Sequence, residues 1–147
     1  MVQTGSQIVA IGHVIQLAVA PVFLLTGVSG LLGVLTNRLA RIIDRARTLE
    51  QQSVHAAAVD QSRLHDELRL LSRRARLINT AVSLSTLCAL LICAVIVALF
   101  LGAFLATDLS LLIGLIFTGG MLALFWALVS FLREIRLAIR TMRIGPH

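Results

Sequence analysis

The sequence predicts an all-α integral membrane protein with three transmembrane helices and a cytoplasmic antiparallel helical hairpin between the first two spans. The chain has 147 residues, of which 58% are hydrophobic and only 14% are charged, against about 25% charged in a typical soluble domain. Three runs contain no charged residue: 14–36, 81–106 and 109–132. About 20 apolar residues suffice to cross a bilayer, so each run can form a span. We therefore treat residues 1–147 as a single membrane domain.

The distribution of basic residues predicts the orientation. All 13 basic residues are arginines, and they occur only in the segment 37–79 and in the tail 133–147. Three spans place these two segments on the same side, and the positive-inside rule makes that side cytoplasmic. The N-terminus and the turn at Thr107–Asp108 are then expected outside. The net charge of +6 is thus interpreted as a topology signal, and no nucleic-acid partner is expected.

The first span combines a proline, polar residues and glycines. Pro21 removes one backbone hydrogen bond and predicts a kink. A polar and small-residue stripe follows one side of the helix, and its members are candidates for lining a pore: His13, Gln16, Ala20, Gly27 and Gly30. The alternative interpretation is that the polar members lie near the headgroups or make one hydrogen bond between helices.

The segment 37–79 carries two apolar seams with heptad spacing, as in a coiled coil. The first consists of Leu35, Leu39, Ile42, Ala46 and Leu49, and the second of Leu64, Leu68, Leu71, Ala75 and Ile78. The polar stretch 51–60 between them is expected to form a turn. Two matching seams joined by a short connection predict the antiparallel hairpin.

The second and third spans carry small residues every four positions, a pattern typical of closely packed membrane helices. The expected packing residues are Ala94, Ala98, Gly102 and Ala106 in the second span and Gly119, Ala123 and Ala127 in the third. Gly33 of the first span is expected to pack in the same way. Asp108 is a suitable N-cap for the third helix. These features predict a tight antiparallel pair.

The tail 133–147 has an apolar and a basic face, which predicts an amphipathic helix lying on the inner leaflet or against the hairpin. Arginines near the cytoplasmic ends of the spans are candidates for contacts with anionic phospholipid headgroups. They are Arg38, Arg41, Arg73, Arg74, Arg76, Arg133, Arg136 and Arg140.

No constellation of residues points to catalysis. His65, Asp66 and Glu67 are adjacent, and adjacent residues on a helix point apart. The sequence has no HExxH, CxxC, P-loop or GxGxxG pattern. We expect no enzymatic activity, no catalytic residues, no cofactor and no metal.

Several blocks of the sequence resemble the DUF2721 family of small bacterial membrane proteins. They are 20–27 (APVFLLTG), 35–41 (LTNRLAR), 44–47 (DRAR), 73–79 (RRARLIN) and 131–134 (FLRE). The resemblance implies a multi-pass protein of the bacterial plasma (inner) membrane. It implies no catalytic or ligand residues.

Three functions agree with these features. The first is a homo-oligomeric ion channel or pore with the first span lining the path, because three spans are too few to enclose a path alone. The alternatives are a non-enzymatic membrane scaffold or assembly factor, whose layout is similar to that of membrane-protein insertases, and a sensor of anionic lipid. Insertases typically carry a charged residue in their membrane groove, and the spans here contain none.

Overall fold

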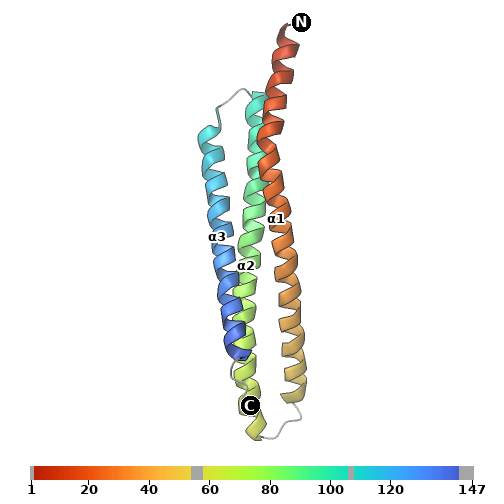
Figure 1. Ribbon diagram of the computed structural model, residues 1–147, viewed down its shortest axis with the longest axis vertical. Helices are drawn as coiled ribbons and strands as arrows, with labels where there is room; N and C mark the ends of the chain where they lie inside the picture. Colours follow the sequence, from red (N-terminus) through yellow and green to blue (C-terminus); the bar gives the residue numbers. More distant parts are fainter. Residues whose placement is uncertain (1, 54–57, 106–107, 143–147) are drawn as a thin grey trace. The chain divides into compact units, whose positions relative to one another are not determined.

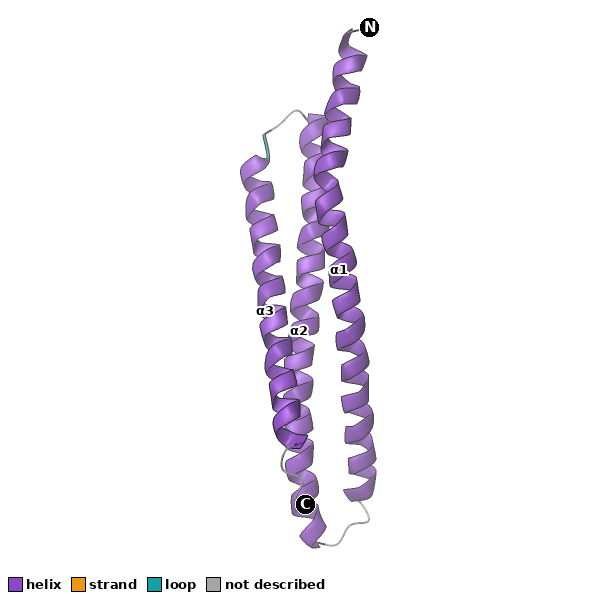
Figure 2. Ribbon diagram, in the orientation of Figure 1, coloured by secondary structure: helices purple, strands orange, loops and turns teal. Residues whose placement is uncertain are grey.

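A computed structural model describes residues 2–53, 58–105 and 108–142. These residues form three α-helices: α1 (Val2–Ser53), α2 (Ala58–Leu105) and α3 (Ser110–Met142) (Figure 1). All described residues are helical except Asp108 and Leu109 (Figure 2). The protein is therefore all-α over the described part of the chain, as the sequence predicts.

Each helix contains a segment long and apolar enough to cross a membrane. The segments are Ile11–Gln51, Leu64–Leu105 and Ser110–Ile139. α1 and α2 run for 52 and 48 residues, more than twice the roughly 20 residues that a span requires. Three such helices indicate a multi-pass membrane protein.

The helix boundaries differ from the sequence-based expectation. α1 begins at Val2, well before the predicted span at 14–36, and it remains helical through Pro21. Of the predicted turn at 51–60, residues 51–53 belong to α1 and residues 58–60 belong to α2, whereas 54–57 lie outside the described residues. Gln and Ala are good helix formers, which agrees with helix at Gln51, Gln52 and Ala58.

The chain divides into two compact units. Unit 1 comprises residues 1–31 and 85–125, and unit 2 comprises residues 32–84 and 126–147. In unit 1, α1 buries Ala18, Pro21 and Val28. The buried face of α2 in this unit consists of Ser85, Cys88, Ile92 and Val95. Many other apolar side chains of this unit are exposed, including Phe23, Phe104 and Leu111, as expected for surfaces that face lipid.

In unit 1, α2 and α3 approach closely at Gly120. A Cβ atom at this position would lie 3.4 Å from Cδ1 of Ile92 and 3.8 Å from the carbonyl oxygen of Cys88. These are ordinary van der Waals distances, so α2 and α3 pack against each other at this glycine, as small residues allow in membrane helix pairs. The sequence pattern emphasised the neighbouring Gly119, whose Cβ would meet only Cδ1 of Leu91, at 3.8 Å.

The other small residues proposed for helix packing have varied environments. Ala123 and Ala127 are buried, Ala98 and Gly102 are half-buried, and Ala94 is exposed. Gly33 is exposed and has no atom near its hypothetical Cβ. Ala106 lies outside the described residues. Packing of Gly33 and Ala94 against another helix stays a prediction that would require a second chain.

In unit 2, both predicted seams are covered, and one set of positions in each seam is more deeply buried than the other. In α1, Leu35, Ile42 and Leu49 are 6% exposed or less, while Leu39 and Ala46 are half-buried. In α2, Leu71 and Ile78 are buried, whereas Leu64, Leu68 and Ala75 are half-buried. The fully buried positions are seven residues apart, which is the period of a coiled-coil core position.

The start of α3 has the predicted cap. Oδ1 of Asp108 accepts a hydrogen bond from the backbone N–H of Ser110 at 3.0 Å, and Ile113 N–H donates to the Leu109 carbonyl at 3.0 Å. An N-cap carboxylate satisfies a backbone donor that the helix itself leaves unpaired. The hydrogen bonds from Ser110 lower the pKa of Asp108.

This cap predicts a small pH dependence of stability. Because the pKa of Asp108 is lower in the folded protein, its contribution is present above the unfolded-state pKa and is lost as pH falls through the folded-state pKa. Asn caps helices equally well without titrating. We expect the melting temperature of Asp108→Asn to exceed that of the parent increasingly as pH is lowered from neutral into the acid range. A constant difference across this range would contradict the prediction.

Candidate functional site

A buried carboxylate on α3 is the centre of the candidate site in unit 2. The side chain of Glu134 is fully buried, although it belongs to the tail that sequence reasoning treated as an amphipathic surface helix. It follows Ala127 by seven residues, and Ala127 is also fully buried, so Glu134 occupies a core position of α3. A buried charge is costly unless it is paired and hydrogen-bonded.

Arg74 of α2 supplies the first partner. Its Nε and Nη2 both donate hydrogen bonds to Oε1 of Glu134, at 3.1 and 2.9 Å. The planar guanidinium presents these two donors in a fixed fork, and charge-assisted bonds of this kind are roughly twice as strong as neutral ones. Arg74 therefore fixes the position of α2 relative to α3 at this level.

Arg38 of α1 supplies the second partner. Its Nη1 lies 3.0 Å from Oε2 of Glu134. The contact has the distance of an ion pair without the geometry of a hydrogen bond, and Oε2 accepts no hydrogen bond within the described part of the chain. We therefore interpret Arg38 as an electrostatic partner of Glu134. Each of the three helices thus contributes one residue to a triad, Arg38–Glu134–Arg74.

Phe131 stabilises the orientation of Arg38. The guanidinium carbon lies 5.3 Å from the centre of the Phe131 ring, within the range of a cation–π interaction. Phe131 precedes Glu134 by three residues and so lies on the same side of α3. One turn of α3 therefore offers Arg38 both an aromatic face and a carboxylate.

The triad leaves a net positive charge. Two guanidinium groups and one carboxylate sum to +1, and the side chains of Arg38 and Arg74 are 31% and 24% exposed. A second ion pair joins α1 to α2: Nη2 of Arg45 lies 3.0 Å from Oε1 of Glu67. Both members of that pair are about half exposed, and exposed pairs add little stability.

A cavity of about 340 Å³ opens beside the triad. It is lined by residues of all three helices: Arg38, Arg41, Ile42, Arg45, Leu71, Arg74 and Glu134. Four arginines and one carboxylate surround it, with Ile42 and Leu71 forming an apolar part of the wall. Such a cavity can accept an anion. No three histidine, cysteine or carboxylate side chains lie together as a metal site among the described residues.

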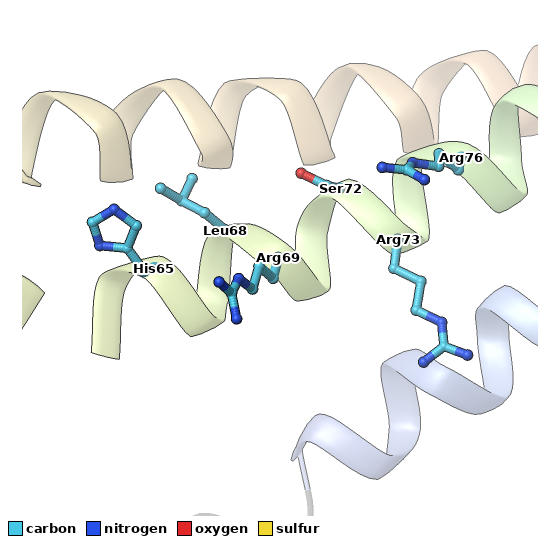
Figure 3. A pocket seen from close by; sticks show the side chains of 6 residues that line it. All are labelled: His65, Leu68, Arg69, Ser72, Arg73 and Arg76. Carbon is cyan, nitrogen blue, oxygen red and sulfur yellow. The ribbon is translucent and has the colours of Figure 1, made fainter. Parts of the chain in front are cut away.

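A second hollow, of about 490 Å³, follows α2. Figure 3 shows its lining residues, all of which come from α2: His65, Leu68, Arg69, Ser72, Arg73 and Arg76. Arg73 extends toward α3 in this view. The lining contains no buried polar side chain. This hollow is therefore lined by one helix alone, whereas residues of three helices line the cavity beside Glu134.

The arginines proposed for lipid contact separate into two groups. Arg38 and Arg74 bind Glu134, whereas the others with described side chains are exposed: Arg41, Arg73, Arg76, Arg133 and Arg136. The side chain of Arg140 lies outside the described set. Contact with lipid stays a prediction for all of them.

The pore-lining candidates lie together on the exposed side of α1. His13, Gln16, Ala20, Gly27 and Gly30 are all exposed, on the side of the helix away from the buried Ala18, Pro21 and Val28. Gly27 and Gly30 have no neighbouring atom within 4 Å of a hypothetical Cβ. The stripe is therefore open within a single chain, and its role in a pore stays a prediction.

Sequence reasoning missed Glu134 as a site residue. Two signals could have identified it. It is the last of the seven acidic residues and stands among four arginines of the tail. It also lies seven residues after Ala127, in phase with the predicted packing face formed by Gly119, Ala123 and Ala127. A carboxylate in an apolar phase requires a basic partner on a neighbouring helix.

The fold and the site define a class: a multi-pass α-helical membrane protein whose three helices meet at one buried carboxylate held by two arginines. The sequence model of the family described as "Protein of unknown function (DUF2721)" matches residues 18–144, and the chain belongs to this family. The matched region contains all three residues of the triad. Comparison with curated proteins and with solved structures finds no match.

Proposed function

We propose that the protein is a non-enzymatic scaffold of the bacterial inner membrane, with the N-terminus outside and the segment 37–79 and the C-terminus in the cytoplasm. The positive-inside rule supports this orientation, because all 13 arginines belong to the cytoplasmic segments. Arg38 and Glu134 directly follow the first and third spans predicted from the sequence, and Arg74 precedes the second. The triad then lies at the cytoplasmic boundary of the membrane.

The observation that carries the scaffold proposal is the triad itself. A carboxylate buried between two arginines connects three helices at one level. Buried ion pairs of this kind contribute little net stability, and their main effect is to specify one arrangement of the helices. A fixed arrangement suits a protein that presents a surface to a partner.

The cytoplasmic segment 37–79 forms, in this proposal, the antiparallel hairpin that presents this surface. Burial of Leu35, Ile42 and Leu49 on α1 and of Ile78 on α2 supports it. The Arg45–Glu67 ion pair, which connects α1 to α2, supports it as well. The partner would be another protein of the membrane or the cytoplasm.

Single-cysteine labelling tests the orientation. In a background with Cys88→Ala and Cys93→Ala, Asp108→Cys is expected to react with a membrane-impermeant maleimide in intact cells, whereas Arg47→Cys reacts only after lysis. The reverse pattern would overturn the proposed topology.

Site-specific photo-crosslinking from residue 47 tests the scaffold role. We expect one heterologous protein to crosslink and to co-purify at a fixed stoichiometry, and this complex to be lost in Glu134→Gln. Crosslinks only between copies of the chain would contradict the scaffold proposal.

A homo-oligomeric channel is the second candidate, favoured by the open stripe on α1. All five candidate residues are exposed, and the glycines among them leave room for another helix to approach. The mass of the protein in lipid nanodiscs and an ion-flux assay in liposomes test this candidate. A monomeric mass, or liposomes without conductance, would contradict it.

A further inference from the structure

The cavity beside the triad combines an anchored pair of arginines with an additional cation. Arg38 and Arg74 are held by Glu134, so their positions are fixed before any ligand arrives. Arg41 lines the same cavity, is exposed and makes no ion pair within the described part of the chain. A preorganised site loses little conformational entropy on binding.

The charge balance of the cavity favours an anion. Four arginines and one carboxylate line it, for a sum of +3. Glu67 neutralises Arg45 and lowers the effective sum to +2. A phosphate group accepts several hydrogen bonds from guanidinium groups. The hydrogen bonds from Arg74 to Glu134 use Nε and Nη2, so Nη1 can donate to a ligand, and Arg41 supplies further donors.

We propose that this cavity is a binding site for the phosphate of an anionic phospholipid headgroup. The inference rests on the proposed topology only for the leaflet in which the lipid lies. Arg38 lies two residues after the first predicted span, and Arg74 lies seven residues before the second. In the proposed topology the triad therefore lies near the level of the lipid phosphates. Ile42 and Leu71 provide an apolar wall for the carbon atoms of the headgroup. Basic pockets between transmembrane helices on the cytoplasmic side are typical sites for such headgroups.

The hollow on α2 provides a stringent comparison. Arg76 is exposed and lies there, two residues beyond Arg74 toward the second span, whereas Arg41 lies three residues beyond Arg38 away from the first span. Diffuse attraction between surface arginines and anionic lipid would therefore depend on Arg76 at least as strongly as on Arg41. A built site in the cavity depends on Arg41 and leaves Arg76 unimportant.

The experiment measures lipid retention by the full chain. Protein reconstituted in phosphatidylcholine nanodiscs containing a minor fraction of phosphatidylglycerol is released and examined by native mass spectrometry. We expect Arg41→Gln to reduce the apparent affinity for phosphatidylglycerol about tenfold, the effect of losing one charge-assisted interaction, and Arg41→Lys to retain part of it. Arg76→Gln is expected to behave as the parent. Equal losses in the two glutamine variants would overturn the proposal.

A second arm distinguishes the two sources of phosphate. Inorganic phosphate is titrated against protein in pure phosphatidylcholine nanodiscs. We expect no phosphate binding that depends on Arg41, so the parent and Arg41→Gln should give the same result. Binding of inorganic phosphate that depends on Arg41 and displaces phosphatidylglycerol would overturn the assignment to lipid. Nanodiscs carry the same lipids in both leaflets, so lipid retention is independent of orientation. A protein that passes the cysteine-labelling test but fails here disproves the lipid site alone.

Discussion

Replacing Glu134 with glutamine is expected to lower the free energy of unfolding by about 3 kcal/mol. The change leaves the guanidinium groups of Arg38 and Arg74 facing each other without a compensating charge, and removing one member of a buried ion pair typically costs 3 to 5 kcal/mol. The low end applies because both arginines retain some exposure to solvent. Chemical unfolding in mixed micelles, compared with the parent protein, measures the loss.

A triple apolar variant is the control for this prediction. In Arg38→Met/Arg74→Met/Glu134→Leu the charges disappear together, and well-packed apolar replacements of buried ion groups are often neutral or stabilising. We expect the triple variant to unfold near the parent value. A Glu134→Gln variant as stable as the parent, or a triple variant less stable than Glu134→Gln, would contradict this account of the triad.

Ile42→Ala is expected to lower the free energy of unfolding by about 3 kcal/mol, whereas Ile43→Ala changes it by less than about 1 kcal/mol. Ile42 is 6% exposed and Ile43 is 41% exposed, although the two are neighbours on α1. Truncating a buried isoleucine removes apolar contacts and leaves a cavity. The same unfolding assay measures both variants.

The pair is well matched, because both substitutions replace isoleucine with the better helix former alanine. Helix propensity therefore contributes equally to each variant. Similar losses of unfolding free energy at the two positions would show that another chain or lipid also covers Ile43. They would contradict the interpretation that α1 buries only the seam that contains Ile42.

The three spans and the seams could be predicted because they depend on local sequence. A charge-free run longer than 20 residues has few alternatives to a membrane helix, and a repeat of seven indicates one buried edge. Residues such as Leu35 and Ile78 are buried as this repeat predicts. The cap at Asp108 was also predictable, because an N-cap acts on the two or three residues that follow it.

The triad and the Gly120 contact could not be predicted in the same way. Both depend on which faces of different helices contact each other. The periodicity of a single helix does not determine which of its faces contacts a neighbouring helix. Glu134 is charged, and a charged residue in a basic tail is usually solvated, so the sequence alone does not indicate its place in the core. Gly119 and Gly120 are adjacent, and only the observed phase of α3 shows that Gly120 contacts α2.

A double-mutant cycle between Arg74 and Glu134 tests most directly the central claim that one buried carboxylate ties the helices together. The variants Arg74→Met, Glu134→Leu and the double replacement are unfolded with the parent protein in lipid bicelles. The triad predicts a coupling energy of at least about 2 kcal/mol, as expected for a close, hydrogen-bonded charge pair. A coupling energy below about 0.5 kcal/mol would contradict the account.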